Sequence, residues 1–168
     1  MKAVLISIQP KWVEKIANGK KTIEVRKTAP KQVPFKAYIY CTFPKKPAYT
    51  LWLNRGTENK FLADGKVIGE FVCDNAEWMS IRDCDKACMT LKEAIDYGKG
   101  KKLYAWHISH LKIYDKPKEL SEFRKPCPYG DLPCWICPSC DRDENDNLIQ
   151  CFNTVSRPPQ SYMYVEEL

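Results

Sequence analysis

The spacing of apolar residues predicts that the chain opens with a strand and a helix. Residues 3–8 form a short continuous apolar run, which is typical of a buried strand. Pro10 follows, and proline is tolerated at the first position of a helix because the N–H that it lacks has no partner there. The apolar residues within 12–17 then fall on one helical face, and Gly19 can adopt the left-handed conformation that ends a helix.

Five later segments have the alternation and composition of strands. In the first of them, the side chains of Thr22, Glu24 and Arg26 share one face, because alternate residues of a strand point the same way. Gly69 lies inside another, which indicates a bulge or a close backbone approach. The five predicted strands are residues 22–27, 35–42, 66–73, 103–114 and 161–165.

The rest of the chain divides into a helix, a loop and a lobe. Thr90 and Glu93 fit a capping box that opens a short helix ending near Gly98. Residues 44–64 are polar and poorly patterned, so they are interpreted as a long loop. In residues 126–152, Pro, Cys, Gly and Asp replace the apolar rhythm, which indicates an inserted lobe.

Together these patterns predict a mixed α+β, β-rich fold. The 168 residues are enough for one hydrophobic core and too few for two ordinary domains. We therefore expect a single domain over 1–168 with a cysteine-rich insertion at about 126–152. The composition, 44% hydrophobic with 12% aromatic residues, is that of a globular protein and excludes a disordered chain.

The amino terminus and the cysteine count bear on the compartment. The apolar run before Pro10 is shorter than a signal-peptide core or a membrane span. The nine cysteines are odd in number and four of them crowd into 127–140, which does not suit a secreted disulfide scaffold. We expect a cytoplasmic protein with no membrane partner.

Positive charge is concentrated in the first part of the chain. Residues 1–50 contain eleven Lys and Arg against Glu14 and Glu24, a net +9, whereas the whole chain carries +6 and the remainder therefore −3. Such an asymmetry favours an anionic partner such as RNA, although scattered lysines also serve solubility alone.

The cysteine-rich lobe has the spacing of a metal site. Two C-x-x-C pairs share one cysteine, and such turns direct thiolates at one ion. We expect a structural zinc ion held by four of five cysteines, because a lobe this poor in apolar residues needs a metal or another cross-link to fold. An iron–sulfur cluster and unmetallated thiols remain as alternatives. The five candidates are Cys127, Cys134, Cys137, Cys140 and Cys151.

Four segments resemble the ASCH family of PUA-like domains. They are ISIQP at 6–10, GKKTIEVR at 19–26, GKVIGEF at 65–71 and YAWHI at 104–108. The resemblance covers residues 1–42, 65–123 and 155–168. It implies a PUA-like pseudo-barrel with short flanking helices, and a cleft that receives RNA or a nucleotide-like ligand.

The resemblance also assigns residues to that cleft. By position, Lys21, Glu24 and Arg26 would line it: lysine offers a point charge to phosphate, arginine a planar fork, and glutamate an acceptor for base or ribose donors. Neighbouring Lys20 and Thr22 join them as ligand-binding candidates, and Tyr162 as a stacking surface for a base. No particular protein partner is indicated.

Some small family members are amidohydrolases with a lysine, a threonine nucleophile and a glutamate. Here Glu24 occupies the threonine position, which removes the expected nucleophile, and Thr22 is the nearby substitute. The enzymatic alternative is therefore a hydrolase of a modified nucleoside or of RNA, of the amidohydrolase or ribonuclease type, with Lys21 and Glu24 as tentative catalytic residues.

A purely structural interpretation of the same residues also stands. Lys20 and Lys21 follow a helix end and can offset its dipole. Glu24 and Arg26 can pair on a solvated strand face.

Overall fold

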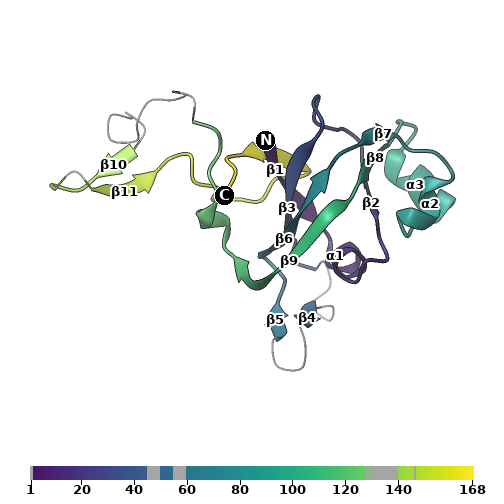
Figure 1. Ribbon diagram of the computed structural model, residues 1–168, viewed down its shortest axis with the longest axis horizontal. Helices are drawn as coiled ribbons and strands as arrows, with labels where there is room; N and C mark the ends of the chain where they lie inside the picture. Colours follow the sequence, from purple (N-terminus) through teal and green to yellow (C-terminus); the bar gives the residue numbers. More distant parts are fainter. Residues whose placement is uncertain (1, 45–49, 55–59, 128, 130–139, 146) are drawn as a thin grey trace.

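The computed structural model describes residues 2–44, 50–54, 60–127, 129, 140–145 and 147–168. Its largest sheet has five strands in the order β12-β1-β3-β6-β9 (Figure 1). Strands β1 and β3 run parallel, and the other neighbours are antiparallel. The strands are β1 (Lys2–Ile8), β3 (Phe35–Cys41), β6 (Val67–Cys73), β9 (Ser109–Lys118) and β12 (Tyr162–Val165).

A second sheet has three strands in the order β2-β8-β7. Its members are β2 (Ile23–Arg26), β7 (Ala76–Trp78) and β8 (Tyr104–His107). Two separate hairpins are β4 (Trp52–Asn54) with β5 (Lys60–Leu62), and β10 (Cys140–Arg142) with β11 (Leu148–Cys151). The helices are α1 (Pro10–Ala17), α2 (Asp83–Lys86), α3 (Leu91–Gly98) and the 3₁₀ helix η1 (Leu120–Glu122).

The main core lies between the two sheets. Trp106 of β8 is fully buried and meets Phe35 of β3 edge to face, with ring centroids 5.0 Å apart. Alternate residues of β1 such as Val4 and Ile6 belong to this core. The intervening Leu5 belongs to a cluster on the opposite face, together with Tyr38. The large sheet is thus covered on both faces.

The second sheet is also covered on two sides. Ile23, Val25 and Ala105 belong to a third cluster with Ala87 and Ala94. Figure 1 shows α2 and α3 beside this sheet. The side chains of Glu24 and Arg26, which alternate with Ile23 and Val25, therefore point away from that cluster.

The prediction of a β-rich α+β fold is confirmed, but the pseudo-barrel is not. Within the described part of the chain, the sheets do not close into a barrel. Strands β9 and β12 end the large sheet, whereas β2 pairs only with β8 in the second sheet. A closed barrel needs hydrogen bonds around the whole circuit, and none of the described ladders joins the two sheets.

Gly69 has the close backbone contact that its position predicts. A Cβ added there would lie 2.4 Å from the carbonyl oxygen of Lys112 in β9, and the β6–β9 register shifts on either side of Gly69. Any larger residue would push the two strands apart.

Two predicted segments are divided differently in the structure. The strand expected over 103–114 is two strands, β8 and β9, which belong to different sheets and are separated at Ile108. The loop expected over 44–64 contains the β4–β5 hairpin. In Figure 1 the β10–β11 hairpin of the expected lobe projects from the sheets. Its status as an insertion in one domain stays a prediction.

None of the helices in the described ranges has the length and apolarity that crossing a bilayer requires.

Candidate functional site

A cleft of about 1170 Å³ lies where β1 ends, beside α1, β2 and α3. The elements that meet here are distant in sequence, so the cleft exists only in the folded chain. Its lining is Ser7, Ile8, Gln9, Pro10, Lys11, Trp12, Lys21, Glu24, Val25, Arg26, Tyr40, Thr42, Phe43, Pro44, Met89, Glu93, Asp96, Tyr97, Pro158, Pro159 and Gln160.

Three of the lining residues are charged and yet almost enclosed. Lys21, Glu24 and Arg26 expose only 3%, 5% and 6% of their surface. Glu24 and Arg26 leave β2 on the same face, and Lys21 precedes the strand. Ionised groups at this depth are tolerated only when they are paired, so their contacts decide what the site can do.

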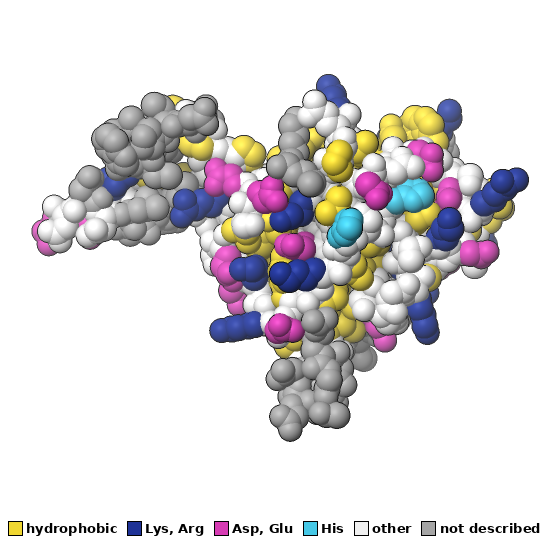
Figure 2. Space-filling model, viewed as in Figure 1, with side chains coloured by type: hydrophobic (Ala, Val, Ile, Leu, Met, Phe, Trp, Pro, Cys, Tyr) yellow, Lys and Arg dark blue, Asp and Glu magenta, His cyan; other side chains and the backbone are white. Residues whose placement is uncertain are grey.

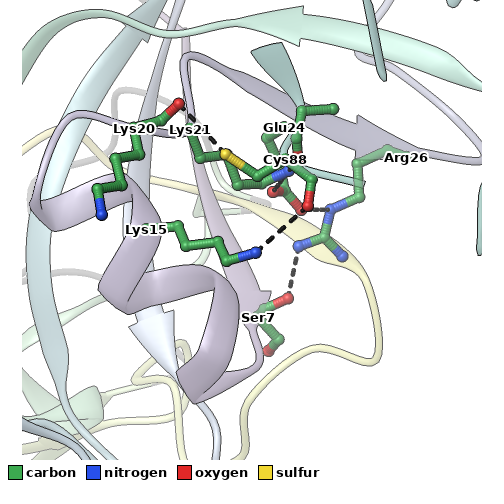
Figure 3. Close-up of polar contacts among 8 residues, drawn as sticks. Ser7, Lys15, Lys20, Lys21, Glu24, Arg26 and Cys88 are labelled. Atoms are coloured by element: carbon green, nitrogen blue, oxygen red, sulfur yellow. Dashed lines mark hydrogen bonds and ion pairs between the residues drawn. The ribbon is translucent and has the colours of Figure 1, made fainter. Parts of the chain in front are cut away.

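Glu24 lies between the two cations (Figure 3). Its Oε2 atom is 3.4 Å from Lys21 Nζ, and its Oε1 atom is 3.1 Å from Arg26 Nε. Neither Glu24 Oε2 nor Arg26 Nε makes a hydrogen bond of acceptable geometry among the described residues, and both atoms are buried. The ion pairs therefore hold the charges together and leave hydrogen-bonding capacity unused.

Lys21 is the most fully engaged of the three. Its ammonium donates to the carbonyl oxygen of Ala87 at 2.8 Å and lies 5.0 Å from the centre of the Trp12 ring, in addition to its contact with Glu24. The ammonium therefore has one hydrogen bond, one ion-pair contact and one cation–π contact. Lys21 is thus fixed in place and joins the segment after α2 to the floor of the cleft.

Arg26 has fewer contacts than its guanidinium has donors. One terminal N–H group donates to the carbonyl oxygen of Ser7 at the end of β1. A guanidinium has five N–H donors, so this bond and the contact with Glu24 leave donors over. Ser7 itself is held by a hydrogen bond from its Oγ to the carbonyl oxygen of Pro159, 2.6 Å away.

The lining contains four aromatic residues, Trp12, Tyr40, Phe43 and Tyr97. The Trp12 ring has the ammonium groups of Lys11 and Lys15 at 4.2 and 5.0 Å from its centre. Tyr97 is partly exposed, and burial raises the pKa of its hydroxyl above the ordinary value. The walls thus combine flat apolar surfaces with nearby cations, an arrangement that suits a planar anionic ligand.

The lining as a whole is not positively charged. Lys11, Lys21 and Arg26 are balanced by Glu24, Glu93 and Asp96. The expectation of a basic cleft requires the positive excess of residues 1–50 to gather in the cleft walls, and it does not. Lys20, Lys27 and Lys31 are exposed and lie outside the lining.

Solved structures with the same arrangement were found. The crystal structure of ASCH from Zymomonas mobilis is 18% identical, with a TM-score of 0.58, covering 99% of this chain and 89% of that one. Two point mutants of the ZmASCH protein from the same organism are also similar. One is 16% identical with a TM-score of 0.57, covering 99% of this chain and 89% of that one. The other is 20% identical with a TM-score of 0.51, covering 71% of this chain and 77% of that one.

The chain has the ASCH-domain fold. The resemblance expected from the four sequence segments is thus confirmed for the fold. No protein-family model matches the chain, and no curated protein matches it in sequence. At these identities the likeness concerns architecture alone.

Within this ASCH fold, three predicted ligand-binding residues lie outside the lining. Lys20 and Thr22 are exposed on the segment between α1 and β2, and the Thr22 amide donates to the carbonyl oxygen of Lys86. Tyr162 on β12 meets Trp106 edge to face at 5.3 Å and forms a hydrogen bond with Thr28. Their role as ligand contacts stays a prediction.

Sequence reasoning missed the contribution of α3. Tyr97, Glu93 and Asp96 line the cleft, and the carbonyl oxygen of Ala87 just before this helix accepts the Lys21 hydrogen bond. These residues are more than 60 positions from Lys21, and no local pattern relates the two segments. The capping box and the amphipathic pattern of this segment predict a short helix, but they do not predict which part of the protein the helix packs against.

The predicted metal ligands are only partly described. Cys134 and Cys137 lie outside the described residues, and the side chain of Cys151 is likewise outside them. Cys127 and Cys140 are partly buried, and the β10–β11 register places Cys140 opposite Cys151. In the described residues, no group of three or more potential ligands clusters. Zinc and its alternative, an iron–sulfur cluster, stay predictions.

Proposed function

We propose that the cleft of this ASCH-fold protein binds RNA or a nucleotide-like ligand, with a base held at the Glu24–Arg26 pair. The observation that carries the proposal is an enclosed carboxylate with an unused acceptor atom, Glu24 Oε2, in the lining of a cleft that also contains arginine. A buried acceptor without a hydrogen bond costs free energy of about 1–3 kcal/mol, which a ligand donor can recover.

A nucleobase edge supplies the complementary groups. Exocyclic amino and ring N–H groups donate to a carboxylate, and carbonyl or ring nitrogen acceptors take hydrogen bonds from the remaining Arg26 N–H groups. Because Glu24 Oε2 is closed to solvent in the free protein, binding includes a small shift of the Glu24 side chain toward the ligand. Trp12 and Tyr97 offer flat surfaces for the base.

The phosphate of such a ligand would lie toward α1. Lys11 is in the lining, and the Lys15 ammonium is close to the same Trp12 ring. These lysines neutralise the phosphate charge, whereas the enclosed Lys21 holds the Glu24 side chain in position.

Direct binding tests this proposal. We expect nucleotides and single-stranded RNA to bind, with the logarithm of the association constant falling linearly with the logarithm of salt concentration. Lys11→Ala weakens binding and reduces that slope, whereas Lys118→Ala, which removes an equal charge from the far end of β9, leaves both unchanged. Glu24→Gln replaces an acceptor by an amide and weakens binding without reducing the slope.

Two outcomes contradict the proposal. One is the absence of binding to any nucleotide or RNA pool. The other is binding that does not depend on salt and is the same in the wild type and in the Lys11→Ala and Glu24→Gln variants.

A further inference from the structure

A row of side chains crosses the second sheet from the cleft to the sheet edge. Arg26 of β2 is the register partner of Tyr104 of β8, and Tyr104 is the register partner of Trp78 of β7. Directly opposed residues on neighbouring strands project from the same face. The face that carries Arg26 into the cleft therefore continues through Tyr104 to Trp78.

Trp78 is stacked and exposed at the same time. Its ring lies 4.2 Å from that of Tyr104, centre to centre, with 30° between the planes, and 53% of the residue is open to solvent. Strand β7 is an edge strand of its sheet, so nothing in the described residues pairs with its outer side. A large aromatic held flat against a second ring, with its remaining surface in water, is a preformed stacking platform.

A lysine lies directly beside this platform. Lys102 Nζ lies 5.2 Å from the centre of the Trp78 ring. Lys99 and Lys101 are exposed in the same turn between α3 and β8. Figure 2 shows hydrophobic side chains gathered on the surface near β7, with both Lys or Arg and Asp or Glu side chains beside them. Aromatic surface bordered by lysines is complementary to a base with its phosphate, more than to an apolar protein surface.

We propose that Trp78 and Lys102 form a second subsite, on which single-stranded RNA extending from the cleft stacks a base and places a phosphate. The inference rests on the proposed function and adds to it that the ligand is a polynucleotide. Strands β2 and β7 are two strand spacings apart, about 10 Å, so a base held at Arg26 and a base stacked on Trp78 belong to different nucleotides.

The experiment compares two ligands on the full chain: a mononucleotide and a single-stranded RNA of about ten nucleotides. Trp78→Ala weakens binding of the oligonucleotide about 5-fold or more, and leaves the affinity for the mononucleotide unchanged. Trp78→Phe retains a stacking ring and recovers most of the loss. Trp52→Ala is the matched control, because Trp52 on β4 is 59% exposed and lies in another sheet. We expect this variant to bind both ligands with the affinity of the wild type.

A second variant keeps the test valid if Trp78→Ala does not fold. Lys102→Ala removes one phosphate contact, so it lowers the salt slope for the oligonucleotide by about one and not that for the mononucleotide.

The outcomes separate the two proposals. If the wild type binds both ligands and neither Trp78→Ala nor Lys102→Ala affects the oligonucleotide, the platform serves another partner, such as a protein, and this inference is wrong. Equal weakening of both ligands by Lys102→Ala also overturns it, because the platform would then not be specific to the longer ligand. If the wild type binds neither ligand, the proposed function fails and this inference fails with it.

Discussion

Glu24 Oε1 lies 3.1 Å from Arg26 Nε, and the side chains of these two residues of one short strand are each only 7% exposed. With Lys21 on its other oxygen, Glu24 is the single anion between two enclosed cations. Breaking a buried ion pair by removing one partner is strongly destabilising, because the remaining charge has no compensation. The same contact that shapes the cleft floor therefore contributes to stability.

The first prediction is that Glu24→Gln lowers the free energy of unfolding by about 3–5 kcal/mol, since it leaves Lys21 and Arg26 without an anion. Urea unfolding followed by tryptophan fluorescence measures this. Glu122→Gln is the control: it breaks the exposed pair with Lys118, which contributes only about 0.3–0.5 kcal/mol. A loss below 1 kcal/mol for Glu24→Gln would mean that the network is solvated in solution.

A second prediction concerns the helix that carries Tyr97 to the cleft. Thr90 caps α3: its Oγ1 accepts from the Glu93 amide at 3.1 Å, and Glu93 Oε2 accepts from the Thr90 amide at 2.8 Å. Hydrogen bonds from Thr90 hold the pKa of Glu93 below its ordinary value of 4.5. Because the pKa is lowered on folding, the stabilisation is complete above pH 4.5 and is lost as the pH falls through the folded value.

We therefore expect the wild type to be more stable than Glu93→Gln at neutral pH, and this advantage to shrink as the pH falls below 4.5. Thr90→Ala loses about 1 kcal/mol at neutral pH, and Thr90→Ser keeps the cap and loses little. Thermal melts at several pH values measure these differences. A stability difference between wild type and Glu93→Gln that does not change with pH would contradict the capping role of the carboxylate.

The opening of the chain is predictable from local pattern. The apolar run at 3–8, Pro10 and the alternation from Ile23 to Arg26 correspond to β1, α1 and β2. In these segments the residues that pack inward also have the spacing of the element, so pattern and packing agree. The alternation also places Glu24 and Arg26 on one face, which is why the contribution of β2 to the cleft could be predicted from the sequence.

The position at which one predicted strand divides into two depends on which strands pair in the folded chain, and local sequence does not predict it. Residues 103–114 have one uninterrupted strand composition, yet the chain leaves the small sheet after His107 and enters the large one at Ser109. The break lies beside His110, which has a positive φ of 47°. Strand partners, and not local propensity, cause it. The closure of the cleft by α3 is equally non-local.

The third prediction separates binding from catalysis. If Lys21 and Glu24 act in proton transfer, wild type converts acylated nucleosides or cleaves labelled single-stranded RNA, and Glu24→Gln does not. We expect a binding protein, because Lys21 is already held by Ala87, Glu24 and Trp12, and because Ser7 Oγ is committed to Pro159. Wild type and Glu24→Gln should then show the same background rate. Faster turnover by wild type, under conditions in which urea unfolding shows that Glu24→Gln is folded, would establish the hydrolase instead.

The last prediction concerns the cysteines between 127 and 151. We propose that the folded chain holds one structural zinc ion through four of Cys127, Cys134, Cys137, Cys140 and Cys151. The pairing of Cys140 with Cys151 across the β10–β11 hairpin brings two of these positions onto neighbouring strands.

Freshly purified protein should contain about one zinc per chain by elemental analysis, and Cys140→Ser should reduce that content. Cys88→Ser, which changes a cysteine outside this segment, should not. A cluster would appear as iron with visible absorption. The absence of both metals would end the proposal, whereas zinc retained by Cys140→Ser would assign the four places to the other cysteines.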